Sequence, residues 1–83
     1  MSREDLISAA LALQCETYAA HTALLGPGSQ ANDGDVRRAH LATLRADRTL
    51  CVLYGEVSAE RVLDCEIKLA IRDAARAGHH IDT

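Results

Sequence analysis

The side chains best suited to bind a ligand or to do chemistry in this 83-residue sequence are polar residues that recur seven positions apart. A helix turns by about 100° per residue, so residues seven apart lie on one face, two turns from each other. Three such pairs lie inside otherwise apolar helical faces: Gln14 and His21, His40 and Asp47, and Glu66 and Asp73. Imidazole, amide and carboxylate groups could form a hydrogen-bonded network or hold a metal ion.

Antiparallel helices with short connections would bring these pairs into two polar layers. One layer would contain His21, His40 and Asp73, and the other Gln14, Asp47 and Glu66. We expect these side chains to lie at the edge of the core and reach water. A buried network that fixes the helix register is the second alternative. A metal site is the third, but the sequence lacks the Glu-x-x-His spacing of carboxylate-bridged bundles, so we predict no metal and no other cofactor.

A second candidate site is basic, and we identify it as a candidate partner-binding surface. Its members share one side of the expected second helix: Arg37, Arg38, Arg45 and Arg48. Guanidinium groups bind carboxylates through paired hydrogen bonds, so this side could hold an acidic partner surface. The alternative is a solvated charged face, which runs of charge usually are.

The three cysteines give no sign of a disulfide framework, of a zinc site or of catalysis. Cys15, Cys51 and Cys65 are odd in number and far apart, and we expect reduced thiols in a cytoplasmic protein. Cys51 shares a face with His40, but the two lie about 16 Å apart along a helix, too far for proton transfer. We therefore assign no catalytic residue and do not expect an enzyme.

The stretch that should organise the fold is residues 6–25, which contain a single formal charge, Glu16, and are mostly Leu and Ala. These are strong helix formers, and a helix with almost no charge is usually buried on more than one side. We expect the other helices and a second copy of the chain to pack around it. The expected dimer interface is formed by Leu6, Leu13, Ala20 and Leu24. Polar residues make this stretch a poor membrane span, and its start is unlike a signal peptide.

The sequence predicts one all-α domain, an antiparallel three-helix bundle. We expect helices over about residues 3–25, 35–54 and 58–77, a loop over 26–34 and a tail over 78–83. The boundary signals are Ser2 and Asn32 or Asp33 ahead of the first two helices, Gly26-Pro27 and Gly55 after them, and Ser58 ahead of the third. Residues 49–57 have a strand-like composition, but a lone strand has no partner, so we favour helix.

Composition favours a binding protein over other classes. There is no Phe or Trp, so a small core gains from oligomerisation, and the net charge of −3 does not attract nucleic acid or an anionic membrane. We expect a small regulatory or adaptor protein that binds another protein, by class-level analogy with inhibitors encoded by phages and mobile elements. The first alternative is a DNA-binding regulator, because residues 53–62 are similar to a helix-turn-helix, although Glu60 would repel phosphate. The second alternative is a metal-binding helical bundle.

Overall fold

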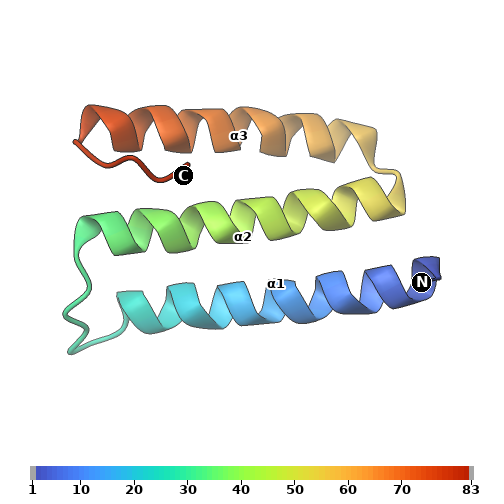
Figure 1. Cartoon of the computed structure of the whole chain (residues 1–83), viewed down its shortest axis with the longest axis horizontal. Helices are drawn as coiled ribbons and strands as arrows, with labels where there is room; N and C mark the ends of the chain where they lie inside the picture. The colour runs from blue at the N-terminus through green and yellow to red at the C-terminus, as the bar shows by residue number, and fades with distance from the viewer. Residues whose placement is uncertain (1, 83) are drawn as a thin grey trace.

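The computed structural model describes residues 2–82, which form three α-helices and no strand. The helices are α1 (Arg3–Leu25), α2 (Asp33–Tyr54) and α3 (Val57–Arg76). Consecutive helices run antiparallel (Figure 1). The all-helical prediction is confirmed, and the ambiguous residues from position 49 to Tyr54 belong to α2.

The first two helices follow the predicted capping residues Ser2 and Asn32, although α2 begins at Asp33, two residues before the predicted start at 35. The Ser2 side chain accepts a hydrogen bond from the Asp5 backbone N–H (3.2 Å), and the Asp5 carboxylate accepts one from the Ser2 N–H (3.4 Å). The Asn32 side chain accepts from the backbone N–H of Asp35 (2.8 Å). Each cap satisfies a backbone donor that has no partner within its helix.

The third helix begins one residue earlier than predicted. Gly55 takes a left-handed conformation (φ 73°) that ends α2, and the chain enters α3 at Val57. Ser58 therefore already lies in the first turn, and Glu56 occupies the cap position without a side-chain hydrogen bond. The prediction that Ser58 caps this helix is wrong, because the glycine turn is tighter than the sequence suggested.

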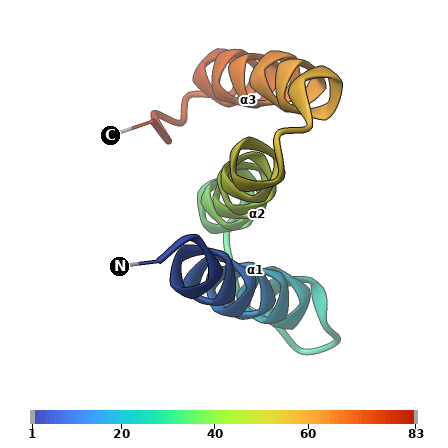
Figure 2. The same cartoon turned by 90° about the vertical axis from the view of Figure 1, so that its right-hand side faces the viewer.

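The central helix is α2, not α1. Both α1 and α3 pack against α2, whereas no Cα atom of α1 lies within 8 Å of one in α3. Seen along the helices, α2 lies between the other two (Figure 2). The only buried residue of α1 is Ala10, whereas α2 buries six residues. α1 has few charges largely because it is rich in alanine, and alanine offers little apolar area for packing. The expectation that the other helices surround α1 is therefore wrong.

The core depends on the C-terminal segment. Its buried residues are Leu41, Ala74 and Ile81, with Ile67 and Ile71 packed against them. Gly78 has a φ of 89°, and the backbone N–H of His79 donates to the carbonyl of Ala74 (2.8 Å). This left-handed helix ending turns the chain back over the layer. Residues 78–82 are therefore not a free tail.

The single layer leaves much apolar surface uncovered. Ten large hydrophobic side chains are exposed: Leu6, Leu11, Leu13, Tyr18, Leu25, Val52, Tyr54, Val57, Val62 and Leu69. The chain exposes 5574 Å², roughly 750 Å² more than expected for a compact protein of 8.9 kDa. None of the three helices is long and apolar enough to span a membrane.

Candidate functional site

One of the two predicted polar layers contains a hydrogen-bonded contact between α1 and α2. The Gln14 amide nitrogen donates to one oxygen of Asp47 (2.8 Å), and the Tyr18 hydroxyl donates to the other (3.2 Å). Gln14 thus lies opposite Asp47, at the level that the sequence suggested. The contribution of Tyr18 was not predicted, because Tyr18 lies outside the seven-residue spacing of the polar pairs. The negative charge of Asp47, together with this hydrogen bond, raises the pKa of Tyr18.

The other layer brings two histidines together. The ring centroids of His21 and His40 are 5.5 Å apart, with the planes inclined by 43°. Within residues 2–82, neither ring forms a hydrogen bond or ion pair with Asp73. The prediction that His21 and His40 lie at the same level is confirmed, but Asp73 does not bind either ring.

None of the six layer residues is buried. His40, Glu66 and Asp73 are exposed, whereas Gln14, His21 and Asp47 are half-buried. The layers reach water because α1 and α3 do not meet over α2, so the polar side of α2 stays open. The alternative of a buried polar network therefore does not hold for the single chain, and the layer residues reach water.

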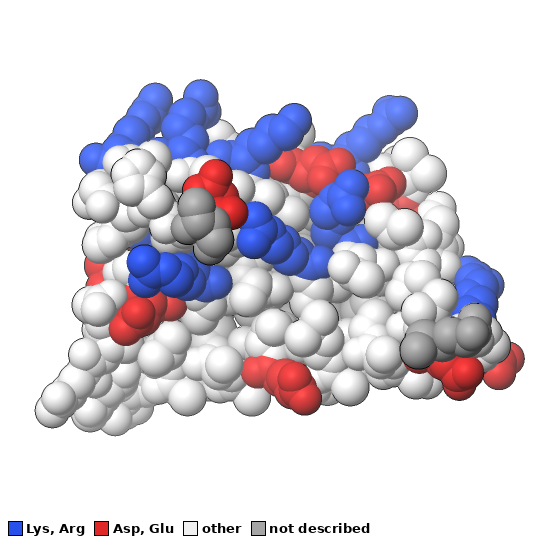
Figure 3. Space-filling view, in the orientation of Figure 1, with Lys and Arg blue, Asp and Glu red and all other residues white. Residues whose placement is uncertain are grey.

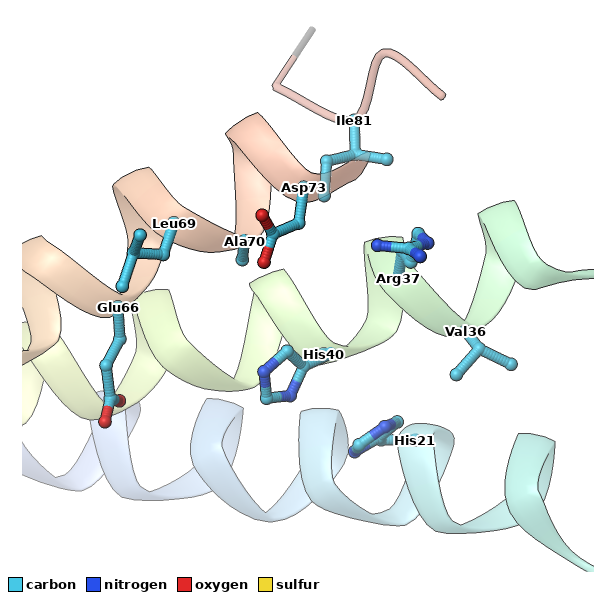
Figure 4. A pocket seen from close by; sticks show the side chains of 9 residues that line it. All are labelled: His21, Val36, Arg37, His40, Glu66, Leu69, Ala70, Asp73 and Ile81. Carbon is cyan, nitrogen blue, oxygen red and sulfur yellow. The ribbon is translucent and has the colours of Figure 1, made fainter. Parts of the chain in front are cut away.

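A cavity of about 540 Å³ lies on this open side, and we call it the interhelical groove. Its lining comes from all three helices and the C-terminal segment: His21, Val36, Arg37, His40, Glu66, Leu69, Ala70, Asp73 and Ile81. Glu66 and Asp73 extend from α3 toward the side where the histidines lie (Figure 4). Within the described residues, no group of three or more His, Cys, Asp and Glu side chains is arranged to hold a metal ion.

The four predicted arginines do not form one basic surface. The Arg37 Nε pairs with Asp33 (2.6 Å), and Arg48 forms ion pairs with Asp64 and Glu60 on α3. The hydrogen bond from Arg37 lowers the pKa of Asp33, and the one to Asp64 raises the pKa of Arg48. These two guanidinium groups form ion pairs within the chain. The spacing of residues along one helix could not predict the pairs of Arg48, because its partners lie on α3.

The other two arginines face a second, smaller cavity of about 280 Å³, beside Leu13 of α1. Arg38 pairs only loosely with Asp35 (3.5 Å), and Arg45 forms no ion pair within residues 2–82. Each lies two residues before a member of the polar layers, His40 or Asp47, and so about 200° around α2. The layer of three helices thus has two faces. We call the one with the interhelical groove the groove face, and the one with Arg38 and Arg45 the arginine face.

The predicted dimer residues are mostly accessible. Leu6 and Leu13 are 43% and 47% exposed, and Ala20 is also exposed. Leu24 is half-buried, so it contributes less free surface than expected. The surface over α1 is largely free of Lys and Arg between its ends, whereas basic side chains gather along α3 (Figure 3).

One contact had no signal in the sequence. The Arg3 guanidinium donates to the carbonyl oxygen of Leu53 through Nη2 (2.6 Å) and Nε (3.2 Å). A cation at the C-terminal end of a helix is favourable there, because the last carbonyls carry partial negative charge. Arg3 therefore fixes the start of α1 against the end of α2.

The cysteines are unpaired, as predicted. Cys15 and Cys65 are exposed, and Cys51 is half-buried. Burial, aided by nearby carboxylates, raises the pKa of the Cys51 thiol. Since the thiolate is the nucleophile, this environment disfavours reactivity at Cys51.

The segment similar to a helix-turn-helix has a different geometry here. α2 and α3 run antiparallel along their lengths (Figure 1), whereas the helices of that motif cross at about 90–120°. No family model, curated protein or solved structure matches this chain. The candidate surfaces are thus defined by geometry: the interhelical groove, the pair Arg38 and Arg45, and the apolar side of α1.

Proposed function

We propose that this protein is a small, non-enzymatic regulatory or adaptor protein that acts by binding another protein, in the manner of a phage- or mobile-element-type inhibitor. The observation that supports this most directly is the apolar surface left exposed by the single helical layer. Large exposed apolar areas on a small chain are typical of protein interaction sites. The three free cysteines favour a reducing compartment, so we propose a cytoplasmic location.

The proposal includes a homodimer formed through α1. Leu6 and Leu13 are exposed on one side of the helix, and the small Ala20 beside them would let two backbones approach closely. The excess surface of the chain is similar to the roughly 800 Å² that each partner buries in a standard interface. Two copies would use the same side of α1, as a two-fold axis requires.

The partner-binding surface that we propose is the arginine face, centred on Arg38 and Arg45. Arginine is enriched among residues that dominate binding energy, and a guanidinium matches a carboxylate through two hydrogen bonds. Ala42 lines the same cavity, so an acidic partner would meet charge and some apolar surface together. No specific observation favours the alternatives of a DNA-binding regulator or a metal-binding bundle.

The partner-binding proposal is tested by affinity purification of the tagged chain from its native cells. We expect Arg38→Ala with Arg45→Ala to weaken capture of the partner by about 1–3 kcal/mol. Arg72→Ala with Arg76→Ala, which removes the same charge from α3, is the matched control. A partner captured equally by both double variants would show that the arginine face is not the binding surface.

The dimer is tested separately by analytical ultracentrifugation at micromolar concentration. We expect the wild type to sediment as a dimer and Leu13→Glu to sediment as a monomer. Leu11→Glu is a matched control, because Leu11 is similarly exposed (41%) but lies about 160° away around α1. A wild type that remains monomeric would refute the dimer.

A further inference from the structure

We propose that the interhelical groove binds a cationic amphipathic helix of a partner protein, with two Lys or Arg side chains seven residues apart against Glu66 and Asp73. This inference rests on the proposed function, since it names a class of partner for a protein that acts by binding. It concerns the groove face, which lies opposite the arginine face.

The first support is the state of the two carboxylates. Asp33, Asp35, Glu60 and Asp64 all pair with arginines, and Asp47 accepts two hydrogen bonds. Several other carboxylates form no ion pair within residues 2–82, and of these Glu66 and Asp73 are the two that line the groove. They lie seven residues apart on α3, which corresponds to about 10.5 Å along the helix axis. Two cations with the same spacing on a facing helix would match them.

The second support is the apolar surface between the carboxylates. Leu69 lies between Glu66 and Asp73 and is 47% exposed, and Val62, seven residues before it, is also exposed. Val36 and Ala70 add apolar lining. A helix with an apolar residue between its two cations would cover Leu69 and pair both carboxylates. Grooves that bind amphipathic helices commonly do so in this way, with anchor residues at helical spacing inserted along the groove.

The arrangement of the three helices favours a helical occupant. The groove is lined by residues from α1, α2 and α3, so a helix lying along it would contact all three. The layer would then become a four-helix assembly, with the open side of α2 covered (Figure 2). Interhelical distances of about 8–10 Å allow such packing.

Charge disfavours a symmetric contact between the groove faces of two copies of this chain. Two groove faces in contact would bring Glu66 and Asp73 of one copy toward the carboxylates of the other. Like charges across an interface are unfavourable. Arg37 also lines the groove, but its guanidinium is paired with Asp33. The unpaired charge in the groove is therefore negative, and its complement is a cation.

The test uses a fluorescein-labelled synthetic helical peptide, rich in Ala, with two Lys seven residues apart and a Leu between them. Fluorescence anisotropy at low salt should detect its binding to the full chain. We expect Glu66→Gln with Asp73→Asn to weaken binding about tenfold, as removal of two exposed ion pairs allows. The matched control is Glu16→Gln with Glu56→Gln, which removes the same charge elsewhere and should change affinity by less than about twofold.

Two further measurements define what would overturn the proposal. A peptide with Glu in place of both Lys should not bind, and Leu69→Ala, at an exposed position, should weaken binding while the chain stays folded. Equal binding of the Lys and Glu peptides, an unchanged affinity of the Glu66 and Asp73 double variant, or no binding to the wild type would each refute the inference. Sedimentation of that double variant as a larger assembly than wild type would show that the groove faces another copy.

Failure of this inference is distinguishable from failure of the proposed function. The Leu13→Glu variant should bind the Lys peptide as wild type does, because Leu13 lies on the other face. If the peptide does not bind while the arginine-face variants lose their partner, the function stands and the groove assignment fails.

Discussion

At the scale of single residues, the seven-residue spacing identified two contacts between side chains but not their environment. Gln14 contacts Asp47, and His21 lies beside His40, because the lengths of the helices and turns fix those levels. Whether such groups are buried depends on contact between α1 and α3, which no spacing within one helix determines. The open groove is therefore a property of tertiary arrangement.

The contact of Tyr18 with Asp47 makes a pH-dependent prediction. The pKa of Tyr18 is raised above its ordinary value of 10.0, mainly because tyrosinate would face the Asp47 carboxylate. A group whose pKa is higher in the folded state stabilises the fold below its unfolded pKa, and this contribution is lost as pH rises through the folded value. The contact between α1 and α2 should therefore weaken above about pH 10.

The prediction is checked by tyrosinate absorbance in a Tyr54→Phe background, where Tyr18 is the remaining tyrosine. Asp47→Asn removes the charge but keeps an acceptor, so we expect it to lower the titration midpoint of Tyr18. Asp73→Asn, on α3, serves as the control and should leave the midpoint unchanged. If Asp47→Asn has no effect on the midpoint, Tyr18 does not contact Asp47 in solution.

At the scale of elements, local chemistry predicted most of the secondary structure. The capping residues Ser2 and Asn32 start α1 and α2, and the left-handed Gly55 ends α2. The error at Ser58 arose because Glu56 and Val57 enter the third helix directly after the glycine turn. Such boundary shifts are local and do not alter the fold.

The role of each helix was less predictable than its extent. The low charge of α1 suggested burial, yet Ala10 is its only buried residue. α2 carries more charge, but it has apolar residues on two sides, such as Leu41 facing the α3 core and Ala46 near Leu13. α2 thus lies at the centre because it has two packing surfaces. The number of charges on a helix does not show how many packing surfaces it has.

At the scale of the whole molecule, the layer has two faces of different chemistry. The groove face carries unpaired carboxylates and the arginine face carries Arg38 and Arg45. A chain with one small core and about 750 Å² of excess surface would gain stability if it associated with a partner. The same openness that weakens the isolated chain leaves both faces accessible to partners.

The C-terminal segment offers the last test of this arrangement, because it closes the core from outside the three helices. Ile81 is 5% exposed and packs with Leu41 and Ala74, which joins the end of the chain to α2 and α3. Ile81→Ala removes three carbon atoms from that cluster, so we expect a loss of about 2–4 kcal/mol in the free energy of unfolding by urea. Val52→Ala, at an exposed position of α2, is the control and should cost less than about 0.5 kcal/mol. The total stability of a domain this small is only about 5–10 kcal/mol, so the loss would be plain in the urea midpoint. If Ile81→Ala unfolds at the same urea concentration as Val52→Ala, the segment does not dock on Leu41, and the core consists of α2 and α3 alone.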